Sequence, residues 1–363
     1  MVKVNDNVNR LYGDKGYLAE LEHLCKLNLP WEKLQGKKVM LSGATGLIGS
    51  FLVDVLLRKN KDGLNCKIYA LGRNKQKSII RFSQWIDDEM YEFVSYDVNE
   101  RLVDSDFDQI DYIMHLASNT HPKQYSTDPI GTIMTNVIGT KNLLDFAVSH
   151  NSRRFLFASS NEIYGENRGD VELFNEDYCG YINCNTLRAG YPESKRCGEA
   201  LCQAYINQYK MDVVILRLTR SYGPTLLGDD SKALSQFIKK GIAGEDIVLK
   251  SDGSQLYSYT YVADAVSGLL TVLLKGENGS AYNVSNEKYD VSLKQVAEMI
   301  ANYLGVKVVY DVPDAIEARG YSVATKARLD SEKLRLLGWI PQNDLATGLR
   351  KTLDILKRIQ FGG

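Results

Sequence analysis

Short runs of consecutive apolar residues alternate with longer stretches of helical spacing between residue 36 and about residue 220. Unbroken apolar runs are typical of parallel strands covered on both faces. The intervening stretches repeat their apolar residues every three or four positions, as amphipathic helices do. We therefore predict strands at 37–43, 66–72, 91–96, 111–118, 153–160 and 211–218, and helices at 48–59, 132–150 and 192–209.

This alternation predicts an α/β fold, a doubly wound parallel sheet of the Rossmann type. After Tyr222-Gly223-Pro224 the pattern loosens into helical stretches at 233–243 and 293–304 and strand-like segments around YSYTY and AYNVS. No linker rich in Pro, Gly or Ser divides the sequence there. We expect a smaller C-terminal α/β lobe that is interleaved with the main sheet and returns some strands to it.

The first 36 residues precede this pattern. Leu18, Leu21, Leu24 and Leu27 recur at helical spacing ahead of Pro30-Trp31. We interpret residues 1–36 as an N-terminal helical extension whose leucines pack against another surface, such as a subunit contact.

The composition of the chain excludes several classes of protein. The 363 residues are 44% hydrophobic and 25% charged, an ordinary globular mixture. Basic and acidic residues number 44 and 45, which removes the electrostatic argument for a nucleic-acid or anionic-membrane partner. The sequence shows neither a membrane span nor a signal-peptide core. The six cysteines form no C-x-x-C pair, so we expect a cytoplasmic protein without zinc or disulfides.

The first predicted strand runs into a glycine-rich turn and then a helix. Glycines at this spacing let the chain turn tightly and let a pyrophosphate approach the backbone, where free N–H groups and the helix dipole favour an anion. Because the turn opens a βαβ pattern, we predict a dinucleotide site. Residues 37–222 should then be mainly an NAD(P)-binding domain and 223–363 mainly a substrate lobe. The predicted loop contacts are Gly43, Thr45, Gly46, Leu47, Ile48 and Gly49.

The residues after the second and third strands bear on the choice of dinucleotide. An NAD site normally places an acid on the ribose 2′-hydroxyl at the end of the second strand. This chain has Arg73 and Asn74 there, and Arg73 favours the 2′-phosphate of NADP. The alternative is a solvated loop arginine. Asp97 and Val98 follow the third strand, where the Asp97 carboxylate is placed to accept from the adenine amino group.

Tyr191 and Lys195 have the Y-x-x-x-K spacing and precede the sixth strand. Proline suits the first helical position, so we expect the helix to begin at Pro192, with Tyr191 at its mouth. The lysine ammonium and the helix N-terminus would then stabilise a phenolate. Lowering a tyrosine pKa from about 10 to about 7 requires roughly 4 kcal/mol of such stabilisation. With 22 tyrosines the spacing alone is weak, and its place at the carboxyl edge of the sheet strengthens it.

These features resemble the extended short-chain dehydrogenase/reductase family, the nucleotide-sugar epimerases, dehydratases and decarboxylases, over residues 37–340. The marks are GATGLIG (43–49), HLAS (115–118), TNVIGTKNLL (135–144), SSNEIYG (159–165), YPESK (191–195), RSYGP (220–224) and LGW (337–339). The resemblance implies a tightly bound NAD(P), a nucleotide-sugar substrate and a homodimer built on helices 132–150 and 192–209. It also implies dinucleotide contacts from Leu116, Ala117, Ser118 and Ser159.

In this family, Tyr191 would take the proton from a sugar 4-hydroxyl while C4 gives hydride to the nicotinamide. Lys195 would hold the ribose, and Ser160 would hydrogen-bond the same sugar oxygen. The next two residues, here Asn161 and Glu162, direct the fate of the 4-keto sugar. A carboxylate at 162 favours chemistry beyond epimerisation, although a purely structural carboxylate is the alternative.

Relatives differ at these two positions. The dTDP-glucose 4,6-dehydratases carry Asp-Glu, and Asn161 cannot donate the proton that their Asp supplies to the departing hydroxyl. The UDP-glucuronate decarboxylases carry Ser-Glu, since a β-keto acid loses its carboxylate without an acid at C6. The GDP-mannose 4,6-dehydratases also show Ser-Glu, with NADP and an arginine like Arg73, so dehydration stays open.

Two segments are most similar to the decarboxylases: the loop 117–130, which contains Tyr125, and Asp230-Ser231-Lys232, where Lys232 replaces an arginine. The family usually has Asn at 220 and Arg at 257, whereas this chain has Arg220 and Tyr257. We hypothesise that Arg220 now holds the sugar diphosphate. The alternatives are a different nucleotide, or an Arg220 paired with an acid such as Asp229. The predicted substrate residues are Tyr125, Arg220, Lys232 and Tyr257.

The sequence thus favours an enzyme like the UDP-glucuronate decarboxylases. The alternatives are an NDP-hexose 4,6-dehydratase, then a 4-epimerase and, in a different class, a non-catalytic nucleotide-sensing protein, against which the intact Ser160, Tyr191 and Lys195 argue. Resemblance to the decarboxylases favours NAD, whereas Arg73 favours NADP. We expect no metal, and interpret His115 as a packing residue and His121 as a loop residue.

Overall fold

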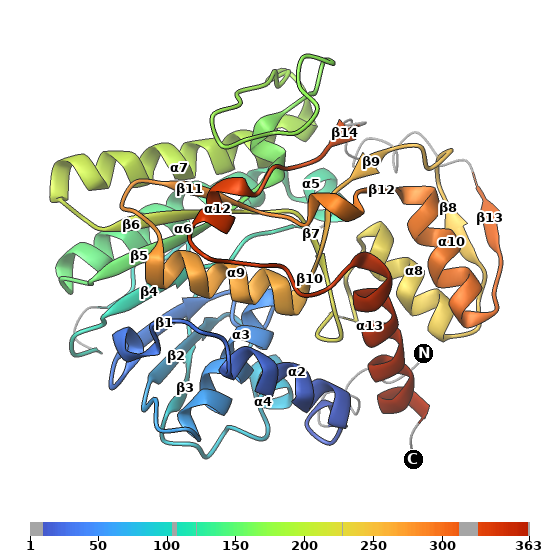
Figure 1. Cartoon of the computed structure of the whole chain (residues 1–363). Coiled ribbons are helices and arrows are strands. Elements are labelled where there is room, and N and C mark those ends of the chain that lie inside the picture. The colour runs from blue at the N-terminus through green and yellow to red at the C-terminus, as the bar shows by residue number, and fades with distance from the viewer. Residues whose placement is uncertain (1–9, 104–106, 121, 227, 312–325, 362–363) are drawn as a thin grey trace.

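Figure 1 shows a computed structural model of the chain, which describes residues 10–103, 107–120, 122–226, 228–311 and 326–361. Seven parallel strands form the central sheet in the order β11-β6-β5-β4-β1-β2-β3. They are β1 (Lys38–Ser42), β2 (Lys67–Gly72), β3 (Tyr91–Ser95), β4 (Tyr112–His115), β5 (Arg154–Ser160), β6 (Val213–Leu218) and β11 (Ala281–Val284). The predicted doubly wound parallel sheet is confirmed.

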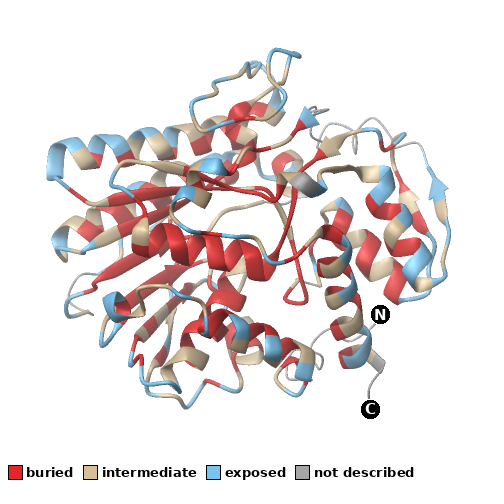
Figure 2. Cartoon of the chain, in the orientation of Figure 1, coloured by how far each residue is buried: buried red, intermediate tan, exposed pale blue. Residues whose placement is uncertain are grey.

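Both faces of this sheet are covered, as the unbroken apolar strands require. Val39 and Leu41 of β1 belong to one buried cluster, and Met40 between them belongs to another. Successive side chains of a strand point to opposite faces, so each face packs against its own helices. One face carries α3 (Leu47–Asn60) and α9 (Val262–Lys275), and the other carries α6 (Pro129–Ser149) and α7 (Gly190–Tyr209). Figure 2 shows the central strands and α9 as buried.

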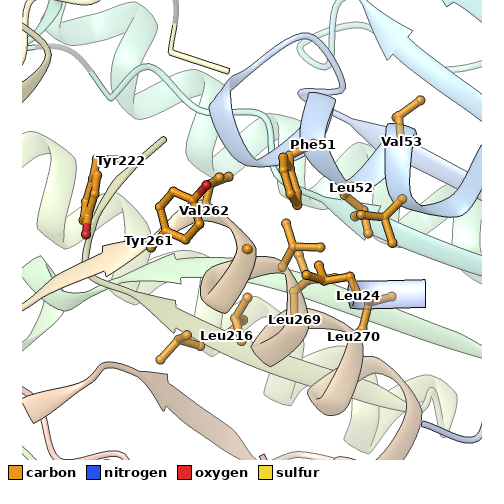
Figure 3. Packing of buried hydrophobic residues seen from close by; sticks show 14 of the residues in the cluster. Leu24, Phe51, Leu52, Val53, Leu216, Tyr222, Tyr261, Val262, Leu269 and Leu270 are labelled. Atoms are coloured by element: carbon orange, nitrogen blue, oxygen red, sulfur yellow. The ribbon is translucent and has the colours of Figure 1, made fainter. Parts of the chain in front are cut away.

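The N-terminal extension forms the helix α2 (Lys15–Cys25). Its Leu24 lies beside Leu52 of α3 and Leu269 of α9, all in one buried cluster (Figure 3). The leucine face therefore completes the core of its own chain. Leu21 and Leu24 are buried, whereas Leu18 and Leu27 are only partly buried, so a subunit contact of this segment stays a prediction.

A buried ion pair attaches this N-terminal segment to α3 and to α4 (Lys75–Arg81). Asp54 of α3 accepts a hydrogen bond from Arg81 Nη2 at 2.5 Å, from the Tyr12 hydroxyl at 2.8 Å and from the Trp85 indole at 3.0 Å. The Tyr17 hydroxyl donates to the same carboxylate. Four donors thus surround one carboxylate that has no exposed surface.

The C-terminal part of the chain contributes to two regions. The helices α8 (Ala233–Ile242), α10 (Leu293–Leu304) and α13 (Leu345–Phe361) pack together, beside the parallel pair β8 (Ile247–Leu249) and β13 (Val308–Tyr310). The same part of the chain supplies α9 and β11 to the sheet, so lobe and sheet interleave. Short pairs lie between them: β7 (Arg220–Tyr222) with β10 (Tyr259–Tyr261), and β9 (Leu256–Tyr257) with β12 (Val291–Ser292) and β14 (Lys326–Ala327).

The remaining elements are short. They are η1 (Trp31–Leu34), α5 (Pro122–Thr127), η3 (Asn161–Tyr164), η4 (Leu187–Ala189), η5 (Glu287–Tyr289) and α12 (Glu332–Leu336). Within the parts of the chain described above, no helix has the length and apolar character that crossing a membrane requires.

Candidate active site

A cleft of about 1010 Å³ lies between the carboxyl edge of the sheet and the lobe. Because all seven strands run in parallel, the loops that follow them meet at one edge. Of the described residues that were predicted to contact the cofactor or the substrate or to take part in catalysis, all but Asn74 and Ser159 line the cleft. Those that line it are Gly43, Thr45, Gly46, Leu47, Ile48, Gly49, Arg73, Asp97, Val98, Leu116, Ala117, Ser118, Tyr125, Ser160, Asn161, Glu162, Tyr191, Lys195, Arg220, Lys232 and Tyr257.

The three glycines of the loop after β1 are present for different structural reasons. Gly43 has a φ of +73°, and a Cβ there would lie 2.8 Å from the Ala117 nitrogen. A Cβ on Gly49 would lie 2.3 Å from the Gly43 oxygen. Gly46 is the N-cap of α3, and a Cβ there would meet only the Gly43 oxygen, at 3.2 Å. The fold itself needs Gly43 and Gly49, whereas Gly46 leaves space at a helix N-terminus that suits a pyrophosphate.

The residues after β2 place two cations at one end of the cleft. Arg73 is well exposed, and its Nη1 lies 3.8 Å from Asp97 Oδ2. Lys77, which the sequence analysis did not single out, lines the cleft beside it. Asn74 is the N-cap of α4 and accepts from the Lys77 backbone nitrogen at 2.9 Å. Asn74 does not line the cleft, and its predicted cofactor contact stays a prediction.

A buried asparagine connects the loop after β4 to the first turn of α7. The Ser118 hydroxyl donates to Asn136 Oδ1 at 2.7 Å, and Asn136 Nδ2 donates to the Ser194 hydroxyl at 2.9 Å. Ser194 in turn donates to the Tyr191 carbonyl at 2.8 Å. Asn136 was not predicted as a site residue, although a lone amide in the apolar stretch TNVIGT is a signal for such a role.

The predicted start of α7 is two residues late. The helix begins at Gly190, since η4 runs directly into it, and Tyr191 therefore lies inside the first turn. Pro192 is compatible with this, because first-turn N–H groups lack intrahelical partners. The Lys195 amine donates to the Ala158 carbonyl at 2.8 Å, and burial lowers its pKa to about 7.

Tyr191 is buried, and its ring centroid lies 4.9 Å from that of Tyr125. Burial raises the pKa of Tyr191 to about 12, and the negative charge of Glu162 adds to this. Hydrogen bonds with Ser160 and Ser118 and the charge of Arg188 lower it by less. The expectation that the chain alone depresses this pKa is wrong, because desolvation outweighs the nearby donors.

Glu162 of η3 pairs with an arginine that no sequence motif predicted. Arg188 of η4 donates from Nη2 to Glu162 Oε2 at 2.5 Å, and its guanidinium carbon lies 4.6 Å from the Tyr125 ring centroid. Ser160 caps η3 by accepting from the Glu162 backbone nitrogen at 3.2 Å. Arg188 lies in no periodic pattern, and its position three residues before Tyr191 is the sole sequence signal for it.

Arg220 and Tyr257, the two exchanged positions, contact each other. The guanidinium carbon of Arg220 lies 3.4 Å from the Tyr257 ring centroid. Asp229 lines the cleft, but among the described residues no acid lies within ion-pair distance of Arg220. The adjacent loop is held by the buried Asp230, which accepts from the Lys232 backbone nitrogen at 2.9 Å.

Several buried polar atoms of the cleft find no hydrogen-bond partner among the described residues. Native interiors leave few such atoms, so a cluster of them indicates a polar ligand. The atoms are Arg188 Nε and Nη1, Gln124 Oε1, Arg220 Nη1, Ser231 Oγ and the Tyr259 hydroxyl.

Ser159 and His115 lie beside the cleft. Ser159 is buried, and its hydroxyl has no partner within the described chain, so its predicted dinucleotide contact stays a prediction. His115 Nδ1 lies 2.7 Å from the Ser42 hydroxyl, and burial lowers its pKa to about 3. No cluster of His, Cys, Asp or Glu in the described residues is suited to a metal ion. His121 lies outside the described residues.

Comparison with known proteins places the chain among enzymes of this architecture. The model of the NAD dependent epimerase/dehydratase family matches residues 39–285. UDP-glucuronic acid decarboxylase 5 of Arabidopsis thaliana is 33% identical over 315 residues, covering 86% of this chain and 87% of that protein. UDP-glucuronic acid decarboxylase 1 of Danio rerio is 31% identical over 325 residues, covering 89% of this chain and 73% of that protein.

Solved structures show the same fold. The dTDP-glucose 4,6-dehydratase DesIV of Streptomyces venezuelae, with NAD and TYD bound, has a TM-score of 0.76 at 24% identity, covering 88% of this chain and 97% of its own. The UDP-glucuronic acid 4-epimerase of Bacillus cereus, in complex with UDP-glucuronic acid and NAD, has a TM-score of 0.76 at 22% identity, covering 89% and 99%. Sheet order, glycine loop, family match and curated relatives agree, and the chain belongs to the NAD dependent epimerase/dehydratase family.

Proposed function

We propose that this chain is an NAD(P)-dependent enzyme that oxidises C4 of UDP-glucuronate and releases the sugar carboxylate as CO₂. The observation that carries the proposal is the segment Ser160-Asn161-Glu162 at the end of β5. Glu162 is held by Arg188 beside Tyr191, and the buried Asn161 supplies no acid for a departing hydroxyl. The relatives that are decarboxylases by name, 31% and 33% identical, support this reaction over the others.

The loop around Gly46, with Asp97, Val98 and the residues 116–118, would hold the dinucleotide. When bound, the dinucleotide supplies a hydride acceptor and, in its oxidised form, a positive charge. A positive charge in the cleft favours the Tyr191 phenolate, opposing the effect of burial on its pKa. Arg73 and Lys77 favour NADP and the decarboxylase relatives favour NAD, so titrating the dinucleotide-free chain with each decides between them.

The residues at the end of β5 and in the first turn of α7 would each have a separate role in the reaction. Tyr191 accepts the proton of the sugar 4-hydroxyl, and Ser160 holds the same oxygen. Once C4 is a ketone, the C5–C6 bond breaks and its electron pair moves towards O4 as CO₂ departs. The Tyr191 phenol and the Ser160 hydroxyl stabilise that oxygen as charge develops on it. A proton must then reach C5. We assign its relay from water to Glu162, because the carboxylate that pairs with Arg188 carries no proton of its own.

One observation favours a second candidate, an NDP-hexose 4,6-dehydratase. Glu162 at this position also suits a base that removes the C5 proton. That reaction needs an acid for the C6 hydroxyl, and Asn161 does not provide it. A 4-epimerase, which needs no charged group at 162, ranks below both.

Product analysis tests the proposal. The purified enzyme is incubated with UDP-, dTDP-, GDP- and CDP-sugars, and product masses are read by mass spectrometry. We expect loss of CO₂ from UDP-glucuronate, and no turnover by a Tyr191→Phe variant. Loss of water would establish the dehydratase, and an unchanged mass with altered retention the epimerase. Unaltered turnover by Tyr191→Phe would contradict the roles assigned here.

We also propose that Arg220 holds the diphosphate. Its guanidinium is stacked on Tyr257, Nη1 has no partner among the described residues, and it lines the cleft. Arg220→Ala should weaken binding of both UDP and UDP-sugars, because all of them carry the diphosphate. An unchanged binding constant for UDP would exclude this role.

We propose that the enzyme is a homodimer. Exposed apolar side chains gather where α6 begins and in η4, and Ile133 lies against Gly190. A soluble monomer rarely leaves such a patch uncovered. The set is Ile130, Ile133, Met134 and Leu187. A monomeric mass at micromolar concentration in light scattering would contradict the dimer.

A further inference from the structure

Arg188 is placed differently from the other cations that line the cleft. Its side chain is only 12% exposed, and one of its nitrogens is bonded to Glu162. Its Nε and Nη1 have no partner in the described part of the chain. A guanidinium that is withdrawn from water with unused donors is costly, unless a ligand takes those donors. Arg188 is therefore suited to an anionic group of the ligand.

The neighbours of Arg188 locate that group. Glu162 and the Tyr125 ring contact the guanidinium, and the Tyr125 ring packs on the ring of Tyr191. The anion that Arg188 meets therefore lies at the reacting end of the ligand. Arg220, by contrast, contacts Tyr257 on the lobe side.

We propose that Arg188 is a specificity-determining residue that binds the carboxylate of a nucleoside-diphosphate uronate through the donors that Glu162 leaves free. This inference rests on the proposed function, because it concerns the sugar that this site accepts. A guanidinium matches a carboxylate in charge and in planar geometry, and it gains much less from a neutral hydroxymethyl group. Arg188 thus selects a uronate over the corresponding hexose.

Glu162 gives the inference a second consequence. Its negative charge beside the same guanidinium opposes binding of another carboxylate. An arginine without Glu162 would bind the substrate carboxylate more tightly. This charge is lost as CO₂ leaves, so such binding stabilises the ground state more than the transition state and does not accelerate the reaction. Glu162→Gln should therefore tighten uronate binding, whereas removing Arg188 should weaken it.

The test compares the dissociation constants of UDP-glucuronate and UDP-glucose by calorimetry. The dinucleotide-loaded protein carries Tyr191→Phe throughout, so that neither ligand is consumed. This reference should bind UDP-glucuronate at least about tenfold more tightly than UDP-glucose. Arg188→Met should cost UDP-glucuronate about 10–100-fold in affinity and UDP-glucose less than about threefold, since a hydrogen bond to a charged group contributes about 1.5–3 kcal/mol.

Two further variants keep the test specific. Arg188→Lys keeps the charge but loses the planar donors, and its uronate affinity should fall between those of Arg188→Met and the reference. Glu162→Gln should raise uronate affinity by about threefold or more and leave UDP-glucose unchanged.

Arg168 provides the matched control. It also pairs with a glutamate, Glu166 at 3.7 Å, and stacks on a tyrosine, Tyr181 at 4.2 Å, but it is exposed and does not line the cleft. Arg168→Met should change neither dissociation constant. Thermal unfolding of every variant confirms that it is folded.

The outcomes separate the two proposals. If the reference shows no preference for the uronate, the proposed substrate is wrong, and the inference falls with it. If the reference prefers the uronate and Arg188→Met retains that preference, the inference alone is overturned. Equal weakening of both ligands by Arg188→Met and Arg188→Lys would also overturn it, because it would indicate a structural role.

Discussion

Two pairs of a carboxylate and an arginine in the described part of the chain, each with a 2.5 Å contact, differ in burial and in what surrounds them. Asp54 and Arg81 lie in the core, where two tyrosine hydroxyls and an indole also donate to the carboxylate. Around Glu162 and Arg188, two guanidinium nitrogens find no partner among the described residues. Arg81 leaves one such nitrogen.

The surroundings of a buried ion pair indicate whether it serves only the fold or can also meet a ligand. A buried charge pair contributes to the fold when neighbouring groups use its remaining hydrogen-bonding capacity. The pair in the core meets this condition at every nitrogen and oxygen except Arg81 Nε, and it joins α3, α4 and the segment before α2. The pair in the cleft does not meet it, and so its remaining capacity is available to a ligand.

The largest expected effect is on the core pair. Asp54→Asn keeps the shape of the side chain but leaves Arg81 as an unpaired buried cation. The free energy of unfolding should fall by about 3–5 kcal/mol, measured by urea denaturation, while the turnover of the folded fraction is kept. Glu298→Gln, which breaks an exposed pair with Lys294, should cost less than about 0.5 kcal/mol. A comparable loss in both variants would mean that burial of the pair is unimportant.

Lys195 extends the comparison to a buried cation without an acid at ion-pair distance among the described residues. Burial lowers its pKa from 10.5 to about 7, so the folded state disfavours the charged form. The loss of folding stability caused by burying the charged amine is therefore largest below pH 7. It disappears as the pH rises towards 10.5, because the unfolded chain binds the proton more tightly than the folded chain does. Dinucleotide-free wild type should therefore gain about 2–3 kcal/mol of stability relative to Lys195→Met between pH 7.5 and 9.5.

Denaturant unfolding at the two pH values measures this difference. Lys294→Met serves as a control, because Lys294 lies at the surface, where its side chain is 48% exposed and pairs with Glu298. A gap between wild type and Lys195→Met that stays constant with pH would show that Lys195 keeps an ordinary pKa.

The pair in the cleft should cost less stability to break than the pair in the core. Glu162→Gln leaves Arg188 without its acid, but this pair is less buried than the core pair: the Glu162 side chain is 22% exposed, whereas that of Asp54 is 0% exposed. We expect a stability loss of about 1–2 kcal/mol, well below that of Asp54→Asn, together with a much larger loss of turnover. Equal destabilisation by Glu162→Gln and Asp54→Asn would erase the distinction between the two pairs.

The same contrast explains what could be predicted from the sequence. Unbroken apolar runs located six strands of the sheet, and AYNVS became the seventh, because burial on both faces leaves a local signal. The residues of the Gly43–Gly49 loop and the Y-x-x-x-K spacing were found because each motif lies within a few residues of chain.

The ion pairs left no such signal. Glu162 and Arg188 are 26 residues apart, and Asp54 and Arg81 are 27 apart, so only the fold brings the partners together. The pKa of Tyr191 was predicted in the wrong direction for a related reason. The spacing to Lys195 is visible in the sequence, but the desolvation that dominates is a property of the whole cleft.

The smallest effect is expected at the other end of the cleft, in the glycine loop. This loop contains a glycine that the fold needs, Gly49, and one that leaves space for a ligand, Gly46. Gly46→Ala should fold with a stability loss below about 1 kcal/mol, because its φ of −77° suits alanine and its nearest contact is 3.2 Å. The added methyl occupies the space left at the N-terminus of α3, so dinucleotide affinity should fall about fivefold, roughly 1 kcal/mol. Gly49→Ala should instead lose stability, since its Cβ would lie 2.3 Å from the Gly43 oxygen. Calorimetric titration with the dinucleotide measures the change in affinity, and thermal unfolding measures the change in stability. If Gly46→Ala bound the dinucleotide as tightly as wild type, the ligand would not use this space.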